Sequence, residues 1–223
     1  MKKAILVVSF GTSHLDALNN SIKKIEDSIQ ENFKEYDVFR SFTSHMIVRK
    51  LKEKHNMEVL FPEDALKKLG EEGYEEVIVQ PLHIIPGEEF DYIKHMVKEY
   101  EPCFKKIEIG RPIFHYEGFE SGPDDYSYFV DTMKDLIEKN SPCVFVGHGS
   151  AHPSNAVYGC LQSVLIDKDY EDVFVGTVEG YPNFSNVLKK AKKKDIKEIT
   201  IIPLMVVAGD HAKNDMASDE EDS

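Results

Sequence analysis

Three residues in the second half of the chain have the types and the spacing of a metal site. They are His148 in a GHGS segment, Glu179 in VEGYP and His211 in AGDHA, separated by 31 and 32 residues. One strand–helix–strand unit is about 30 residues long. Each candidate therefore comes about one unit after the last, which predicts that all three lie at the same edge of a parallel sheet.

Two imidazoles and one carboxylate are a ligand set that suits a divalent metal such as cobalt, nickel, iron or zinc. The same groups can move protons, because histidine changes its charge near neutral pH and a nearby carboxylate makes imidazole more basic. A purely structural role stays open for each residue. His148 is then a residue beside a tight turn, Glu179 caps a helix, and His211 is a solvated loop residue.

Apolar and amphipathic segments alternate along the chain and must position these candidates. Strands are predicted at residues 4–10, 37–42, 76–85, 106–109, 143–146, 173–177 and 198–207. Helices are predicted at residues 15–33, 47–54, 62–71, 90–100, 126–138, 155–165 and 183–194. Strands that alternate with helices at this spacing are typical of an α/β fold with parallel sheets.

The two halves of the sequence resemble each other. Phe10–His14 aligns with His148–His152 at an offset of 138, and Val77–Glu89 aligns with Ile199–His211 at an offset of 122. We therefore predict two similar α/β halves, residues 1–125 and 126–223, with parallel sheets that face a central cleft. Clefts between domains are where ligands usually bind.

Composition excludes several classes of function. A formal net charge of -13 argues against a nucleic-acid partner, which needs a basic face. No segment has the roughly 18 apolar residues of a membrane span. No glycine-rich phosphate-binding motif occurs, which argues against a nucleotide cofactor. The three cysteines form no CxxC pair, and the apolar run at the start fits a first strand better than a signal peptide, so a cytoplasmic protein is expected.

Several longer segments of the chain resemble the motifs of a known family. They are SFGTS at Ser9, FRSFTSHMIVRKL at Phe39–Leu51, QPLHIIPGEEF at Gln80–Phe90, GHGS, TVEGYP and PLMVVAGDHAKNDMASDEEDS at the end. With these motifs the chain resembles the anaerobic sirohydrochlorin cobaltochelatases of cobalamin biosynthesis, which belong to the class II chelatase superfamily together with the protohaem ferrochelatases. The resemblance covers essentially the whole chain.

The resemblance implies two Rossmann-like (chelatase-like) halves. It also implies the ATP-independent insertion of a divalent metal into a metal-free tetrapyrrole, sirohydrochlorin or precorrin-2. The metal is then a substrate: Co²⁺, with Fe²⁺ and Ni²⁺ left open. The family's metal-binding and catalytic residues fall on His148, Glu179 and His211. The family's chain continues with a further helix and strand, so the resemblance also predicts that this sequence is shortened at its carboxyl end.

A flat, carboxylate-rich macrocycle would need aromatic and basic neighbours. Phe10, Phe90 and Tyr181 are candidates to cover the ring, and Arg40 and Arg49, with Lys50 beside them, suit its carboxylates. His83, at the end of an apolar strand, is a candidate lining residue. Burial in the core is the alternative for His83 and the aromatic residues, and an exposed helix face is the alternative for the basic ones.

Two classes of function remain from the sequence. The first is a cobaltochelatase. The second is a carrier that binds haem or a metal ion without turnover. The sequence leaves the oligomeric state open.

Overall fold

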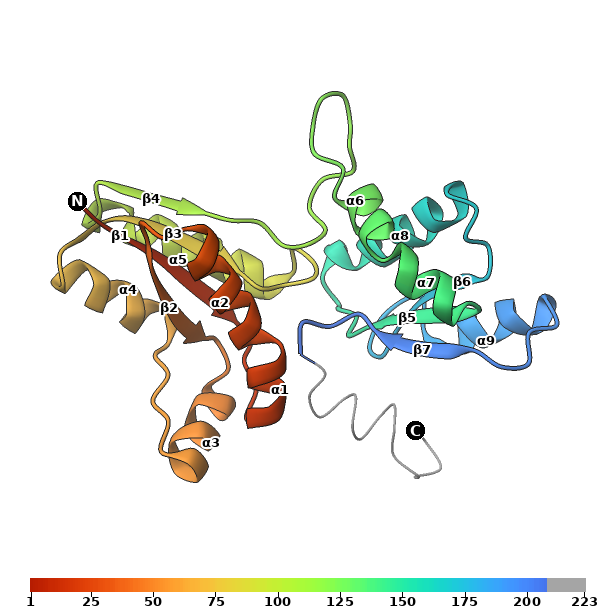
Figure 1. Cartoon of the computed structure of the whole chain (residues 1–223), viewed down its shortest axis with the longest axis horizontal. Coiled ribbons are helices and arrows are strands. Elements are labelled where there is room, and N and C mark those ends of the chain that lie inside the picture. The colour runs from red at the N-terminus through yellow and green to blue at the C-terminus, as the bar shows by residue number, and fades with distance from the viewer. Residues whose placement is uncertain (208–223) are drawn as a thin grey trace. The chain divides into compact units, whose positions relative to one another are not determined.

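The chain folds into two compact α/β units, each built on its own parallel sheet, in a computed structural model that describes residues 1–207 (Figure 1). Unit 1 comprises Met1–His83, Glu88–Pro112 and the described residues from Val206 on. Unit 2 comprises Ile84–Gly87 and Ile113–Met205. The α/β class and the parallel sheets predicted from the sequence are confirmed, whereas the boundary at residue 125 and the central cleft stay predictions.

Unit 1 has a four-stranded sheet with the order β2-β1-β3-β4. Its strands are β1 (Lys2–Ser9), β2 (Asp37–Phe42), β3 (Tyr74–Pro81) and β4 (Lys106–Ile109). Its helices are α1 (Leu15–Asn20), α2 (Ile22–Asn32), α3 (His45–His55), α4 (Pro62–Glu71) and α5 (Glu88–Tyr100), followed by the 3-10 turn η1 (Glu101–Cys103).

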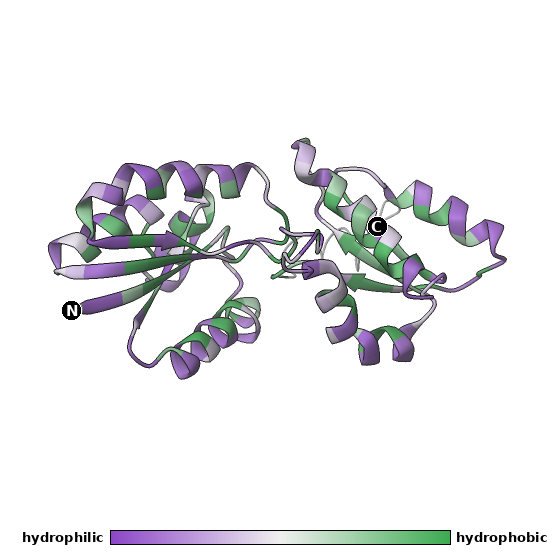
Figure 2. Ribbon diagram, turned by 90° about the horizontal axis from the view of Figure 1, so that it is seen from above, coloured by the Kyte–Doolittle hydropathy of each residue, from purple (hydrophilic) through white to green (hydrophobic). Residues whose placement is uncertain are grey.

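The sheet of unit 1 is covered on both faces. Alternate residues of β1 point to opposite sides, as the period of a strand requires. Leu6 packs in the cluster that includes residues of α4 and α5, and Ile5 packs in another cluster with Ile29 of α2. In Figure 2 the helices of each unit show hydrophobic residues along one side and hydrophilic residues along the other.

Unit 2 has a three-stranded sheet with the order β6-β5-β7. Its strands are β5 (Cys143–Gly147), β6 (Val173–Thr177) and β7 (Thr200–Pro203). Its helices are α6 (Asp125–Thr132), α7 (Lys134–Asn140), α8 (Ala156–Asp167), which follows the 3-10 turn η2 (Pro153–Asn155), and α9 (Phe184–Lys193).

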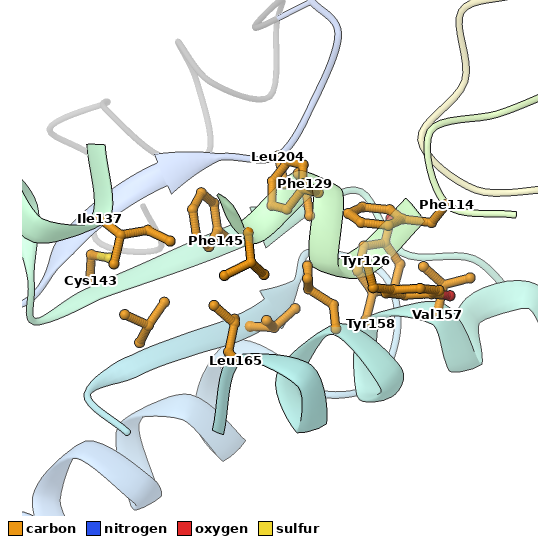
Figure 3. Close-up of a cluster of buried hydrophobic side chains, with 14 residues drawn as sticks. Phe114, Tyr126, Phe129, Ile137, Cys143, Phe145, Val157, Tyr158, Leu165 and Leu204 are labelled. Atoms are coloured by element: carbon orange, nitrogen blue, oxygen red, sulfur yellow. The ribbon is translucent and has the colours of Figure 1, made fainter. Parts of the chain in front are cut away.

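One apolar core joins α6, α7 and α8 to the strands of unit 2. Figure 3 shows Phe129 of α6, Phe145 of β5 and Tyr158 of α8 within this cluster. Cys143 is also fully buried there, and burial raises the pKa of its thiol to about 11. The thiol therefore behaves as a small apolar group, and the rigid core holds the carboxyl end of β5 in place.

Two predicted helices are each divided in the structure, and two predicted strands end more than two residues early. Helix 15–33 is interrupted at Ser21, whose hydroxyl donates to the carbonyl of Ala17 at 2.7 Å and competes with regular helix geometry. Helix 126–138 is two helices that meet at Met133. Strands 76–85 and 198–207 end earlier, at Pro81 and Pro203.

Candidate functional site

His148 and Glu179 lie on adjacent loops at the carboxyl edge of the sheet in unit 2. The pairing of β5 and β6 continues beyond both strands, because Val178 N–H donates to the carbonyl of Gly147 at 3.1 Å and Glu179 N–H donates to that of His148 at 2.8 Å. Both candidate side chains are exposed. Two residues predicted to act together are thus held by one backbone hydrogen bond.

The ring of His148 has a defined tautomer in this arrangement. Its Nδ1 lies 3.0 Å from the carbonyl oxygen of Gly149. Since a carbonyl only accepts, this contact requires a proton on Nδ1, which places the lone pair of the neutral ring on Nε2. Backbone carbonyls commonly orient metal-binding histidines in this way.

Glycine is required where the two loops meet. Gly149 has φ +87°, and a Cβ there would lie 2.7 Å from the backbone nitrogen of Gly180. Neither backbone could yield to such a contact, and a positive φ strains any other residue. The close approach of Gly149 and Gly180 keeps the loops of His148 and Glu179 together.

Tyr158 of α8 lies beneath this edge. Its ring fills the space that a side chain at Gly147 would occupy, and its hydroxyl accepts a hydrogen bond from Gly149 N–H at 3.4 Å. Burial raises the pKa of the phenol, so it stays protonated. No sequence pattern distinguished Tyr158, because a tyrosine at a core position of a helix is ordinary.

The third predicted ligand, His211, lies outside the described residues. Within residues 1–207, no group of three or more His, Cys, Asp or Glu side chains is arranged to hold a metal ion. The three-residue site therefore stays a prediction, of which the structure describes the first two residues.

The aromatic candidates differ in exposure. Phe10 directly follows β1 and is 51% exposed, and Tyr181 follows β6 and is 70% exposed. Phe90 of α5 is only 4% exposed. Phe10 and Tyr181 can therefore meet a ligand without rearrangement, whereas Phe90 is packed in its unit.

The two arginine candidates also differ. The guanidinium of Arg40 binds the carboxylate of Glu26 with two hydrogen bonds, of which the bond from Nε to Oε1 is 2.7 Å long. Arg49 is exposed on α3. A substrate carboxylate would have to compete with Glu26 for Arg40, so Arg49 is the more accessible of the two.

His83 follows β3 and is the most strongly perturbed histidine among the described residues. Both ring nitrogens are buried without a hydrogen-bond partner in the described part of the chain. Burial lowers the pKa of its imidazole from the ordinary 6.5 to about 4, because charging a buried ring loses hydration. His83 is therefore neutral at physiological pH.

A cavity of about 530 Å³ lies in unit 1, along the edge formed by β4 and α5. It is lined by Ile78, Lys94, Val97, Lys98, Glu101, Ile107, Glu108, Ile109 and Gly110. None of the predicted site residues within 1–207 lines this cavity.

Comparison with known proteins identifies the family. A family model described as cobalt chelatase (CbiK) matches residues 3–223. The chain belongs to the cobalt chelatase (CbiK) family. This confirms the resemblance drawn from the GHGS, TVEGYP and AGDHA motifs.

Two curated relatives of this cobalt chelatase family member match it along its whole length. It is 37% identical over 226 residues to the sirohydrochlorin cobaltochelatase of Salmonella typhimurium strain LT2, covering 100% of this chain and 83% of that protein. It is 29% identical over 229 residues to the sirohydrochlorin cobaltochelatase CbiKC of Nitratidesulfovibrio vulgaris strain Hildenborough, covering 100% of this chain and 78% of that protein.

Solved structures support the chelatase fold. SirB from Bacillus subtilis with Fe³⁺ aligns with a TM-score of 0.62 at 19% identity, over 91% of this chain and 76% of that one. The sirohydrochlorin chelatase SirB from Bacillus subtilis subspecies spizizenii in complex with cobalt aligns with a TM-score of 0.51 at 16% identity, over 96% and 92%. At these identities the likeness concerns the fold alone.

Proposed function

We propose that this chain is a sirohydrochlorin cobaltochelatase, which inserts Co²⁺ into sirohydrochlorin with release of two protons and without ATP. The match to the cobalt chelatase family over residues 3–223 is the observation on which this assignment rests. The 37% identity to the Salmonella enzyme supports the substrate. The adjacency of His148 and Glu179 supports the location of the chemistry.

In this proposal His148, Glu179 and His211 bind the incoming cobalt. Imidazole nitrogens and a carboxylate suit a borderline divalent cation, and one negative charge partly offsets the charge of the ion. The tautomer with a proton on His148 Nδ1 leaves Nε2 for the metal. A set that binds moderately is appropriate here, because the ion must leave it for the macrocycle.

The free-base macrocycle must lose two pyrrole protons as the metal enters. A neutral imidazole that releases the ion regains a lone pair and can accept such a proton. His148 and His211 are therefore assigned both to metal delivery and to proton uptake. Glu179 balances the charge at each stage.

Substrate contacts are assigned to the residues that meet solvent beside the strand ends. Phe10 and Tyr181 would contact the faces of the macrocycle, and Arg49 would pair with its carboxylates. Arg40, Phe90 and His83 remain candidates, with Arg40 dependent on release from Glu26. Precorrin-2 shares this chemistry and is an alternative substrate.

The ligand types alone do not select cobalt over nickel or iron. Affinity for nitrogen and oxygen ligands follows the Irving–Williams order, in which nickel exceeds cobalt and cobalt exceeds iron. Selectivity must therefore come from geometry or metal supply. Parallel insertion assays with Co²⁺, Fe²⁺ and Ni²⁺ would rank the three ions.

We also propose that the enzyme is cytoplasmic and needs no nucleotide. Cys103, Cys143 and Cys160 are free thiols, which supports a reducing cytoplasmic location. Among the described residues, none of the helices combines the length and apolar character needed to span a membrane. Nucleotide independence is supported by the lack of a phosphate-binding motif.

A turnover assay tests the function directly. Metal-free sirohydrochlorin and Co²⁺ are mixed with a small amount of protein, and the absorption spectrum of the macrocycle is followed. We expect many equivalents of cobalt product per chain and loss of this turnover in His148→Ala and Glu179→Ala. A spectral change that stops at one equivalent would instead identify a carrier that binds tetrapyrrole or metal without turnover.

A further inference from the structure

The side chain of Asn155 connects the two loops of the candidate site. Its Oδ1 accepts a hydrogen bond from Ser150 N–H at 3.0 Å, on the loop that carries His148. Its Nδ2 donates to the carbonyl of Tyr181 at 2.6 Å, on the loop that carries Glu179. Because an N–H only donates and a carbonyl only accepts, the orientation of this amide is fixed.

Asn155 is also packed directly against the second loop. A Cβ added to Gly180 would lie 2.5 Å from Asn155 Oδ1 and 3.1 Å from the Cα of Gly149. The amide therefore occupies the place where the two loops come closest.

The position of Asn155 is itself fixed by a chain of hydrogen bonds. His152 N–H donates to Ser150 Oγ at 3.0 Å, Ser154 N–H donates to His152 Nδ1 at 3.1 Å, and Asn155 N–H donates to the carbonyl of His152 at 2.9 Å. Helix α8 begins at the next residue, Ala156, and buries Tyr158 in the core. A rigid helix thus presents the amide to both loops.

We propose that Asn155 is a positioning residue for metal binding, which sets the separation between His148 and Glu179 by holding their loops together. The inference rests on the proposed role of these two residues in holding Co²⁺. Asn155 needs no contact with the ion. Outer residues that orient metal ligands change metal affinity by about 10- to 100-fold when they are lost.

The direct test is Asn155→Ala, which removes both hydrogen bonds to the loops. We expect Co²⁺ to bind about 10- to 100-fold more weakly, with a larger rise in the KM for Co²⁺ than in the KM for sirohydrochlorin, because the loop of Tyr181 also carries a proposed substrate contact. The visible absorption of bound Co²⁺ should also change, because its ligand geometry is altered. A purely structural role would lower thermal stability without this selective effect on the metal.

Asn140→Ala is a matched control. The amide of Asn140 donates to the carbonyl of Leu136 at 2.7 Å on the exposed surface of α7, so the same substitution is made in the same unit. Its Co²⁺ affinity should equal that of the unchanged chain. Asn155→Ser is the second variant if Asn155→Ala does not fold, because its hydroxyl is a shorter acceptor that cannot span both loops.

Combination with His148→Ala separates the inference from the proposed function. If His148→Ala weakens Co²⁺ binding and Asn155→Ala does not, the positioning role is wrong and the proposed metal site stands. If His148→Ala leaves Co²⁺ affinity unchanged, the site is wrong and the positioning role falls with it. In the double variant we expect no loss beyond that of His148→Ala, since coupled residues are not additive.

Discussion

The loops that follow β1 and β5 are two versions of the same turn. His14 N–H donates to Thr12 Oγ1 at 3.2 Å in unit 1, and His152 N–H donates to Ser150 Oγ at 3.0 Å in unit 2. The glycines before them, Gly11 and Gly149, have φ +91° and +87°. These positions share the offset of 138 residues, so the internal repeat extends to individual hydrogen bonds.

What surrounds the two turns is different. A Cβ at Gly11 would lie 2.5 Å from the ring of Phe42, whereas at Gly149 it would meet the backbone of Gly180. Phe10 stands where unit 2 has His148. The repeat thus provides a common scaffold, and a few side chains make one copy apolar and leave the other with a potential metal ligand.

The third strands of the two units, β3 and β7, also share a hydrogen bond and differ in the side chain that follows it. Leu82 N–H donates to the carbonyl of Val8 at 2.7 Å, and Leu204 N–H donates to that of Val146 at 2.8 Å, each directly after the proline that ends its strand. The next residue is the buried His83 in unit 1 and Met205 in unit 2. Unit 1 therefore has a buried, neutral imidazole, while the exposed imidazole of unit 2 is His148.

Among these predictions, replacement of His148 by the residue at the matching position of unit 1 should have the largest effect on cobalt insertion. His148→Phe, which places the residue of unit 1 in unit 2, should lower cobalt insertion at least about 100-fold, because a metal ligand contributes more than the outer residues that orient it. Phe10→Ala should keep Co²⁺ affinity unchanged. Isothermal titration with Co²⁺ and the insertion assay measure both, and equal losses in the two variants would remove the distinction between the turns.

The two positive-φ glycines should respond alike in stability and differently in metal binding. Gly149→Ala and Gly11→Ala should each cost about 2–4 kcal/mol, from strained backbone and overpacking together. Only Gly149→Ala should weaken Co²⁺ binding, because it separates the loops of His148 and Glu179. Urea unfolding gives the first quantity and Co²⁺ titration the second; weaker binding in Gly11→Ala alone would contradict the comparison.

The stability of the protein at low pH should depend on the His83 imidazole of unit 1. The folded pKa of His83, about 4, lies below the ordinary 6.5, so the unfolded chain takes up the proton first as the pH falls. Above pH 6.5 this group does not lower the free energy of unfolding. Between pH 6.5 and pH 4 the free energy of unfolding falls by up to about 3 kcal/mol, because only the unfolded chain takes up the proton. His83→Gln should flatten this part of the profile, and a profile that keeps its slope in this variant would contradict the assignment to His83.

The shared hydrogen bond of the two turns should give the smallest effects. Thr12→Val and Ser150→Ala each remove the acceptor for one histidine N–H and should cost about 1 kcal/mol or less. Thr12 is buried, so its variant should lose more than that of the partly exposed Ser150, where water can replace the hydroxyl. Thermal unfolding measures both, and a larger loss at Ser150 would show that the turns differ in more than their neighbours.

Much of the fold and part of the candidate site could be predicted from local patterns. Strands 37–42, 106–109 and 173–177 and helix 62–71 have the predicted bounds, because hydrophobic periodicity and Pro62 act over a few residues. The GHGS and VEGYP segments were predicted to lie at one sheet edge, and the structure joins them by the hydrogen bond from Glu179 to His148.

The sequence by itself determined the alternation of strands and helices, the internal repeat and the residue types able to bind a metal. Each of these can be read from local periodicity or from a motif. Only the tertiary structure decided that Asn155 bridges two loops, that Arg40 pairs with Glu26 and that the ring nitrogens of His83 are buried with no hydrogen-bond partner among residues 1–207. Each of these depends on groups that lie far apart along the chain. Tertiary packing determines which of these groups come into contact, and local sequence patterns do not show it.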